Sequence, residues 1–236
     1  DGGNNWLQQE IGTSHYLASV HFVDADTGYA VGDNGVIFKT NDGGSNWLLQ
    51  TSGDCSWLNS VHFPNANIGY AVGSFGTILK TTDGGDTWLQ QNSGTDEFLN
   101  AVYFIDADAG YAVGPDGVIL KTIDGGNNWM QQESGIYDEI NSVHFIDEDT
   151  GYAVGYDCPI LKTTDAGNNW IQQTNNTSYK LYSVYFANVD TGYAVGSDGI
   201  ILKTSNGGNS WRQQEIGISY DFKLESIHFL NADTGY

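Results

Sequence analysis

Short apolar runs separated by turn residues follow one another along the whole chain. In the first copy of the pattern these runs cover residues 17–23, 28–31, 36–40 and 47–50, and each is rich in β-branched or aromatic residues. No stretch of ten residues shows the period of a helix. Runs of this length, bounded by Gly, Asn and Asp, are typical of strands. The pattern therefore predicts four short antiparallel strands in each copy.

The connectors between these runs are short and have the composition of tight turns. Residues 24–28 read DADTG, residues 32–35 read GDNG and residues 41–44 read NDGG. Asn, Asp and Gly tolerate the positive φ angles that hairpin turns require. We therefore expect consecutive strands to be joined by hairpins.

The pattern repeats with a period of 41 residues. The tryptophans that mark it are Trp6, Trp47, Trp88, Trp129, Trp170 and Trp211. A Gly-Tyr pair keeps the same step until the last copy, Gly235-Tyr236, which is displaced by two residues. Four antiparallel strands in a unit of this length are the signature of a β-propeller blade. An open β-solenoid is the alternative, although its coils are usually shorter.

The predicted fold class is all-β, a propeller of six four-stranded blades in one domain spanning residues 1–236. The length equals five periods of 41 plus 31 residues. We expect residues 1–9 to supply the fourth strand of the last blade and residues 224–236 its first strands. Twelve positions equivalent to 30–41 are then missing from that blade. Either the chain is a window of a longer protein, or a neighbouring chain donates the strand, which repeated head to tail would build a filament.

The turn before each tryptophan carries a recognisable motif. It reads TTDGGDTW over residues 81–88 and TTDAGNNW over residues 163–170. This motif resembles the Asp-box of several propeller families, S/T-x-D-x-G-x-T-W. The fuller unit of residues 110–129 resembles repeats of the photosystem II assembly and stability factor family and related repeats of secreted bacterial proteins. The resemblance implies a propeller and an extracellular or cell-surface location.

The charge balance excludes several partners. The chain holds 8 Lys and Arg residues against 29 Asp and Glu residues, a formal net charge of −21. A nucleic-acid partner needs clustered basic residues, and an anionic membrane surface is disfavoured for the same reason. No apolar run approaches the roughly 18 residues of a spanning helix, so membrane insertion is not expected. The aromatic content of 13% also argues against a disordered acidic tail.

The Asp-box residues are predicted to be structural. A carboxylate in this place can hold a turn by accepting backbone N–H bonds, while the tryptophan packs beside it. The residues so assigned are Asp42, Trp47, Asp83, Trp88, Asp124, Trp129, Asp165 and Trp170.

Acidic turns form a second repeated group. The pattern D-x-D-x-G at Asp24 and Asp26, and again at Asp106 and Asp108, could supply oxygen ligands to Ca²⁺. The second copy has Asn65 at the first of these positions, and a plain turn would allow such an exchange. The turn interpretation is favoured, and neither a metal nor a cofactor is predicted.

Two polar columns also follow the period. Lys39, Lys80, Lys121, Lys162 and Lys203 lie on the third strand, where each is expected to neutralise a carboxylate and pack its stem on aromatic rings. His21, His62, His144 and His228 share a first-strand column with Tyr103 and Tyr185. Imidazoles near a central channel could bind metal or titrate. Exchange with tyrosine favours packing instead.

The connectors that follow the fourth strands differ from copy to copy and carry aromatic candidates for binding. Loops on a rigid scaffold are where binding usually resides. The candidate binding residues are Tyr16, Trp57, Phe98, Tyr137, Tyr179 and Tyr220. Cys55 and Cys158 are two copies apart, so an intrachain disulfide is not expected. Asn175 and Asn176 begin overlapping glycosylation sequons.

Enzymatic activity is not predicted. Asp-boxes also occur in sialidases, which need an arginine cluster, and this chain has the single arginine Arg212. No nucleophile motif, metal cluster or phosphate-binding loop is present in the sequence. Two functions remain. The first is an extracellular structural propeller that assembles with itself into filaments. The second is a protein- or glycan-binding module that uses the aromatic connectors.

Overall fold

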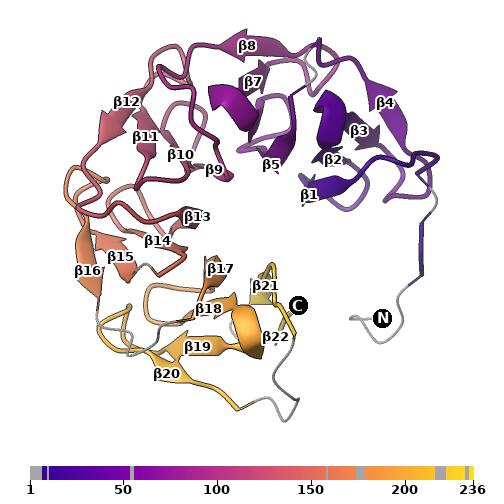
Figure 1. Ribbon diagram of the computed structural model, residues 1–236. Helices are drawn as coiled ribbons and strands as arrows, with labels where there is room; N and C mark the ends of the chain where they lie inside the picture. The colour runs from indigo at the N-terminus through magenta and orange to yellow at the C-terminus, as the bar shows by residue number, and fades with distance from the viewer. Residues whose placement is uncertain are drawn as a thin grey trace. The chain divides into compact units, whose positions relative to one another are not determined.

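The computed structural model shows an all-β protein with the β-propeller fold (Figure 1). It describes residues 7–9, 11–53, 56–157, 159–173, 179–215, 222–231 and 234–236. Within these ranges there are five four-stranded antiparallel sheets and one two-stranded hairpin, and no α-helix. In every sheet the strands lie side by side in chain order. The prediction of four-stranded antiparallel blades is therefore confirmed.

The strands have closely similar bounds from copy to copy. The first sheet contains β1 (Leu17–Phe22), β2 (Gly28–Gly32), β3 (Ile37–Thr40) and β4 (Leu48–Gln50). The second contains β5 (Leu58–His62), β6 (Gly69–Gly73), β7 (Ile78–Thr81) and β8 (Leu89–Gln91). The third contains β9 (Ala101–Phe104), β10 (Gly110–Val113), β11 (Ile119–Thr122) and β12 (Met130–Gln132).

The remaining sheets continue the series. The fourth contains β13 (Ile140–Phe145), β14 (Gly151–Gly155), β15 (Ile160–Thr163) and β16 (Ile171–Gln173). The fifth contains β17 (Leu181–Phe186), β18 (Gly192–Gly196), β19 (Ile201–Thr204) and β20 (Arg212–Gln213). The hairpin is formed by β21 (Phe229–Asn231) and β22 (Thr234–Gly235).

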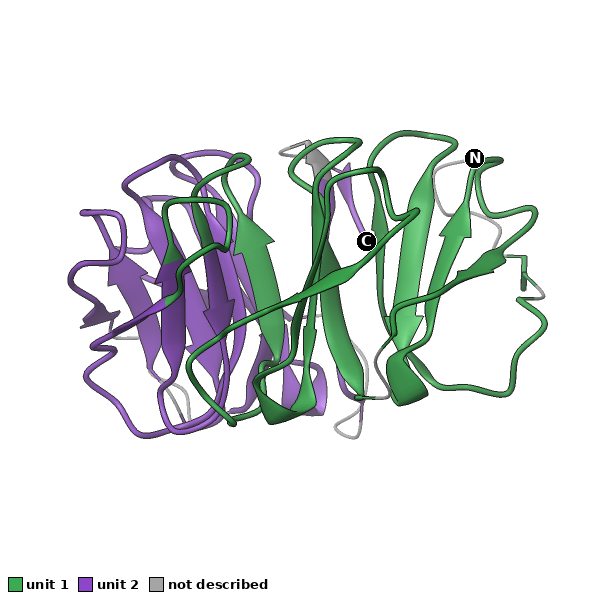
Figure 2. Cartoon of the chain, turned by 90° about the horizontal axis from the view of Figure 1, so that it is seen from above, with its two compact units in different colours: residues 1–110, 122–129 green, residues 111–121, 130–236 purple. Residues whose placement is uncertain are grey.

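The chain divides into two compact units, coloured separately in Figure 2. Unit 1 contains residues 1–110 and 122–129, and unit 2 contains residues 111–121 and 130–236. Among the described residues, no helix is long and apolar enough to cross a membrane. The expectation of a single domain, and of six blades, stays a prediction.

A β-bulge near the start of the first strand sets which side chains are buried. In the second sheet, Leu58 pairs with Gly73 but Ser60 pairs with Val72, so one residue is extra. The bulge brings Leu58 and Val61, three positions apart, onto the same buried side, although an unbroken strand alternates every two residues. The same irregularity occurs after Leu17, Ile140 and Leu181.

A short 3₁₀ turn joins the second strand to the third in three of the copies. These turns are η1 (Asp33–Gly35), η2 (Ser74–Gly76) and η3 (Ser197–Gly199). The middle residue of each has a positive φ, 53° at Asn34 and 54° at Asp198. Asn and Asp are the residues, after Gly, that reach this backbone region most readily. The turns are therefore tight, as the sequence predicts.

The two acidic turns of one sheet lie at the same end of that sheet. In the first copy the Gly43 amide donates to the Asp26 carbonyl over 2.9 Å. The same bond joins Gly84 to Asn67 and Gly207 to Asp190. Each Asp-box is thus tied to the turn between the first two strands of its own sheet.

The core of unit 1 lies between neighbouring sheets. Side chains of β2 and β3 pack against the first strand of the next sheet, so Tyr29 and Ile37 join Leu58 and Val61 in one buried cluster. Trp88 closes the cluster from the Asp-box side. In unit 2 the equivalent cluster joins Tyr152 and Ile160 to residues of β17 and to Trp211. Burial between sheets therefore supplies most of the hydrophobic stabilisation.

The segments assigned to a sixth blade differ from expectation where they are described. Residues 7–9 lie outside any strand, and residues 1–6 lie outside the described ranges. The strand expected from residue 224 begins at Phe229, where it pairs with Gly235. Tyr193 of the fifth sheet stacks on Phe229 at a ring separation of 4.2 Å. The hairpin therefore packs as the beginning of another repeat, and closure of a sixth blade stays a prediction.

Candidate functional site

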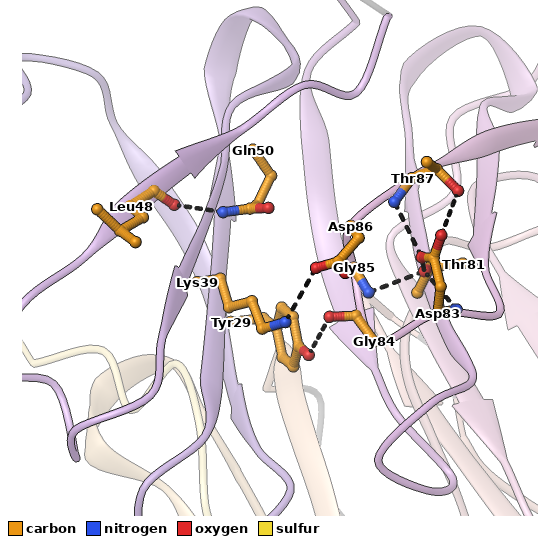
Figure 3. Close-up of polar contacts among 10 residues, drawn as sticks. All are labelled: Tyr29, Lys39, Leu48, Gln50, Thr81, Asp83, Gly84, Gly85, Asp86 and Thr87. Carbon is orange, nitrogen blue, oxygen red and sulfur yellow. Dashed lines mark hydrogen bonds and ion pairs between the residues drawn. The ribbon is translucent and has the colours of Figure 1, made fainter.

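The Asp-box aspartate is engaged by donors of its own turn (Figure 3). Asp83 accepts bonds from the Thr87 amide at 2.9 Å, the Thr87 hydroxyl at 2.6 Å and the Thr81 hydroxyl at 2.8 Å. The Thr81 hydroxyl in turn accepts the Gly85 amide at 2.8 Å. These bonds lower the pKa of the Asp83 carboxyl to about 2, the Thr87 hydroxyl contributing most. Such a carboxylate stabilises a turn and offers little to a ligand.

The other Asp-boxes repeat this geometry. Asp42, Asp124 and Asp165 accept the amide of the residue four positions later over 2.8–2.9 Å. Their pKa values are also lowered, chiefly by the asparagine side chain at that position. The tryptophans of these boxes pack edge-on against a phenylalanine at ring separations of 5.8–6.0 Å; these are Trp47, Trp88, Trp129 and Trp170.

The weak calcium candidates have the geometry of a plain turn. Asp24 accepts the amides of Asp26 and Thr27 at 2.8 and 2.7 Å. Asp106 accepts the corresponding amides of Asp108 and Ala109 at 2.8 Å each. Asn65 makes the same two bonds through its amide oxygen. A neutral side chain thus fills the place equally well, and the described residues form no cluster suited to a metal ion.

In four of the described sheets, the tyrosine that follows the first glycine of the second strand links its sheet to the Asp-box of the next sheet. Tyr29 stacks on Phe63 at 3.8 Å, and its hydroxyl donates to the Gly84 carbonyl at 2.7 Å (Figure 3). Tyr70 makes the same bond to Gly125 at 2.9 Å. In unit 2, Tyr111 and Tyr152 bond to Ala166 and Gly207. Sequence reasoning missed this bond, which joins residues 55 positions apart.

The lysine column differs from expectation in its partners. Lys39 does approach a carboxylate, Asp86, at 3.4 Å. Lys80, Lys121 and Lys162 instead donate to the same Asp-box carbonyls as the tyrosines, over 2.6–2.7 Å. Among the described residues these three lysines have no carboxylate within 4 Å, although Asp165 and Asp149 are close enough to act on the charge of Lys121. The ammonium groups of the column lie over tyrosine rings, as at Lys203, whose Nζ is 5.2 Å from the Tyr193 centroid, and packing of the stems stays a prediction.

The histidine column consists of aromatic contacts between neighbouring first strands. In unit 1, His62 lies 4.9 Å from both His21 and Tyr103. In unit 2, Tyr185 lies 4.8 Å from His144 and 5.0 Å from His228. Burial, helped by the charge of His228, lowers the pKa of His144 to about 4. A buried neutral imidazole serves packing here.

The candidate binding aromatics do not all come together. Trp57 and Phe98, both about half exposed, line one groove in unit 1. Tyr16 is exposed in unit 1 but is not among the residues lining that groove. In unit 2, Tyr137 is exposed, whereas Tyr179 packs against the core. Tyr220, Cys55, Cys158, Asn175 and Asn176 lie outside the described residues.

The groove has a volume of about 610 Å³ and lies at the 3₁₀-turn end of the first two sheets. It is lined by two hairpin turns, η1 and η2, by the connectors at 56–57 and 98–100, and by Asn59 of β5. The η2 turn is fixed to both connectors, because the Ser74 amide donates to the Trp57 carbonyl and the Gly76 amide to the Glu97 carbonyl. The lining residues are Asp33, Asn34, Ser56, Trp57, Asn59, Ser74, Phe75, Phe98 and Asn100.

Phe75 is the unusual residue of this groove. It has a φ of 56° in the middle of η2, where other copies place Asn34, Asp116, Asp157 and Asp198. Its side chain is 71% exposed, with its ring 5.9 Å from that of Phe98. A bulky side chain in this backbone region costs about 1–2 kcal/mol, yet the ring gains little burial. Sequence reasoning missed Phe75, although aligning the copies shows a phenylalanine in an Asn/Asp column.

The sheets, hairpins and Asp-boxes define the chain as a β-propeller built from Asp-box repeats. The family described as "Photosynthesis system II assembly factor YCF48" matches residues 2–92, 54–131, 88–177 and 170–236. Together these segments span nearly the whole chain, and the protein belongs to this family. The sequence-based resemblance is confirmed. A comparison with curated proteins finds no match.

Several solved structures share the fold. YCF48 bound to a D1 peptide is 20% identical, with a TM-score of 0.53, over 95% of this chain and 90% of that one. YCF48 from Cyanidioschyzon merolae is 18% identical, with a TM-score of 0.63, over 98% and 94%. An ancestral GH74 enzyme is 16% identical, with a TM-score of 0.74, over 92% of this chain and 33% of that one. At these identities the likeness concerns the fold.

Proposed function

We propose that this chain is a non-enzymatic protein-binding propeller module, and that the groove of unit 1 takes a segment of a partner polypeptide. The single observation that carries the proposal is Phe75, an exposed aromatic residue held at φ 56° over the groove. Strained residues at a surface groove are a reason to suspect function, because folding alone would select a better turn residue.

The chemistry of the groove suits a polypeptide. Trp57, Phe75 and Phe98 offer apolar surface of the kind that anchors protein interfaces. The three asparagines and two serines of the lining carry amide and hydroxyl groups that match the polar groups of a peptide backbone. The fixed turn η2 holds Phe75 in place before binding, so less conformational entropy is lost on association.

The comparisons support a protein partner more than a glycan. The chain belongs to the YCF48 family, and one YCF48 structure is described as bound to D1 peptide. GH74 enzymes share the fold, but glycoside hydrolysis normally needs two carboxyl groups facing one bond. Among the described residues that line the groove, Asp33 is the one carboxylic acid. This composition supports binding without hydrolysis.

Selection of binders from a random dodecapeptide library tests the proposal. Selected peptides should bind wild-type protein and lose at least about tenfold in affinity for Phe75→Asn. Asn is the residue that the first copy uses in this turn, at Asn34, so the variant should fold. We expect it to be more stable than wild type by about 1 kcal/mol, because the backbone strain is relieved. Urea denaturation measures that change.

Ile123→Asn provides a matched control. Ile123 is an exposed apolar residue of unit 1 that does not line the groove, and the first copy has Asn41 at the same position. The control should bind the selected peptides like wild type. If no selected peptide distinguishes Phe75→Asn from wild type, the groove is not a peptide site. A xyloglucanase of the GH74 group, from Xanthomonas campestris, also shares the fold. Binding of xyloglucan oligosaccharides that is lost in Phe75→Asn would therefore assign the groove to glycans.

Self-assembly is a second candidate function, favoured by the exposed side of the first sheet. Val20 is 60% exposed, whereas the equivalent Val61 of the second sheet is 4% exposed. Leu17 and Phe22 are exposed beside it, although Leu58 and Phe63 are buried by the preceding sheet. The surface that covers Phe63 is a Gly-Tyr-Ala-Val strand. We therefore propose that the equivalent strand of a second protein molecule covers the exposed side of the first sheet.

The oligomeric state tests this second candidate. Light scattering after gel filtration should show assemblies that grow with protein concentration, and Val20→Lys should disperse them. The matched change Leu89→Lys, on the exposed outer strand β8, should leave them intact. A wild-type protein that stays monomeric at high concentration would rule out self-assembly and, with it, the filament hypothesis.

An extracellular or cell-surface location is also proposed, supported by the resemblance to repeats of secreted bacterial proteins. Cell fractionation with an antibody to the native protein would test it, and recovery in the cytosolic fraction alone would overturn it.

A further inference from the structure

We infer that the segment bound in this groove is basic, with a lysine or arginine next to an apolar or aromatic anchor. This inference rests on the proposed function and specifies the partner's chemistry. The anchor would lie against Trp57, Phe75 and Phe98, and the cation would lie between the aromatic surface and Asp33. Three independent features of the described residues support it.

The first feature is the charge around the groove. Unit 1 contains 14 Asp and Glu residues and two lysines, Lys39 and Lys80, which gives a formal charge of −12. Asp96 and Glu97 are exposed and directly precede Phe98. Among the described residues that line the groove there is neither lysine nor arginine. An acidic rim of this kind attracts a cationic segment and repels an anionic one.

The second feature is the placement of Asp33. Its side chain is about one-fifth exposed and belongs to the groove lining, with Oδ1 2.8 Å from the Nδ1 of His15. Its amide donates to the Tyr16 carbonyl, so the η1 turn holds the residue in place. A partly buried carboxylate is screened less by solvent than an exposed one. It can therefore add specificity for a cation that is already held against the aromatic surface.

The third feature is an internal comparison between repeats. Asp33 and Tyr156 occupy equivalent positions of their hairpins, and Trp57 and Lys180 occupy equivalent positions of the connectors, three periods of 41 apart. In unit 2 the chain supplies both partners of a cation–π contact, because the Lys180 Nζ lies 3.4 Å from the centroid of the Tyr156 ring. In unit 1 the same two positions supply an aromatic ring and a carboxylate. His15 lies beside the carboxylate, and neither of the two positions carries a lysine or arginine, so a ligand can supply the cation that the ring and the carboxylate would hold.

Peptide substitutions combined with a groove variant test the inference. The probes are dodecapeptides selected on wild-type protein that lose binding to Phe75→Asn. We expect them to be enriched in Lys or Arg beside Trp, Tyr, Phe or Leu. Changing that Lys or Arg to Gln should weaken binding by about tenfold. In Asp33→Asn the same peptide change should reduce the affinity clearly less, because the peptide cation and the Asp33 carboxylate interact in the wild-type complex.

Asp116→Asn serves as the charge control. It removes one negative charge from a hairpin turn at the position where the first copy has Asn34, and Asp116 is not among the residues that line the groove. Changing the peptide's Lys or Arg to Gln should weaken its binding to this variant as much as its binding to wild type. If groove-dependent peptides are neutral or acidic, the partner is not basic. If changing their Lys or Arg to Gln weakens binding equally in wild type and Asp33→Asn, Asp33 does not hold the cation. In either case the inference fails and only the proposed function survives. If basic peptides bind Phe75→Asn and wild type equally, the attraction is non-specific and the inference fails.

Discussion

At the scale of single residues, the turn positions with a positive φ angle show where the repeat uses a residue other than the glycine that fits this backbone region best. The Asp-boxes place Gly43, Gly84, Gly125 and Gly207 at positive φ, and the fourth copy places Ala166 there with a φ of 56°. The Ala166 carbonyl accepts both the Tyr111 hydroxyl and the Lys121 ammonium, so the turn keeps its role. No binding role is proposed for Ala166, whereas the strained Phe75 is proposed to contact a bound peptide.

Ala166→Gly should stabilise the protein by about 1 kcal/mol, because glycine adopts positive φ without a steric cost. The midpoint of urea denaturation measures the change. Gly84→Ala is the reverse substitution at the equivalent position and should destabilise by a similar amount. A loss of stability in Ala166→Gly would contradict the argument and would mean that the alanine methyl group contributes to packing.

The residues of the groove could be predicted in part. Trp57 and Phe98 were visible as aromatic residues in variable connectors, and the structure brings them to one groove. Tyr137 and Tyr179 are also aromatic residues in variable connectors, but neither lines the groove. Their connectors resemble those of the groove in composition but belong to other sheets. Phe75 was missed because its hairpin looked like a turn, and only its backbone conformation and exposure distinguish it.

At the scale of elements, the bonds between neighbouring sheets explain how one blade holds the next. In most copies the Asp-box carbonyl accepts two side-chain donors, as Gly125 does from Tyr70 and Lys80. Gly84 accepts the Tyr29 hydroxyl, whereas Lys39 turns toward Asp86 (Figure 3). The carbonyl of Gly84 therefore depends more on its tyrosine.

Tyr29→Phe should cost more stability than Tyr70→Phe. Removing one donor from Gly125 leaves the Lys80 bond, so we expect a loss near 0.5 kcal/mol, whereas Tyr29→Phe should cost about 1–2 kcal/mol. Thermal denaturation of both variants measures the difference. Tyr137→Phe, at an exposed side chain, is the reference for loss of a hydroxyl. Equal losses at Tyr29 and Tyr70 would show that the second donor is irrelevant.

The pKa of His144 on β13 predicts a pH dependence of folding. The folded-state pKa is lowered from 6.5 to about 4, chiefly because the imidazole is buried. The unfolded chain binds the proton more readily, so this contribution to stability is fully present above pH 6.5. It is lost as the pH falls from 6.5 toward 4, at up to about 1.4 kcal/mol per pH unit.

His144→Tyr should remove this contribution to the pH dependence of the free energy of unfolding. Tyrosine already occupies the column at Tyr103 and Tyr185, and it does not titrate in this range. Urea denaturation at a series of pH values between 4 and 7 would show it. His21→Tyr, in the same column, is the comparison variant. A wild-type protein whose stability is constant over this range would contradict the pKa shift.

At the scale of the whole molecule, the net charge of −21 is the dominant electrostatic fact. Much of it lies in turns repeated once per copy. Three of the seven lysines donate to Asp-box carbonyls, and Lys39–Asp86 is the one lysine–carboxylate pair within 4 Å among the described residues. Like charges at this density repel one another in the compact state. Stability should therefore depend on ionic strength.

Raising the NaCl concentration from about 10 mM to about 150 mM should raise the melting temperature, because the screening length falls from roughly 30 Å to roughly 8 Å. Differential scanning calorimetry at constant pH measures the effect. KCl at the same ionic strength should act alike, which would separate screening from ion binding. A melting temperature that is flat or falls with salt would show that repulsion does not limit stability.

The sequence by itself determined the repeat, the strands, the hairpins and the family, because these follow from local periodicity and turn chemistry that recur every 41 residues. Only the tertiary structure decided the bulge after Leu58, the bonds from each tyrosine to an Asp-box 55 residues away, and the meeting of Trp57, Phe75 and Phe98. The physical reason is that these features depend on packing between neighbouring sheets. A period in the sequence shows that sheets repeat, but the contacts between them depend on register, burial and backbone conformation.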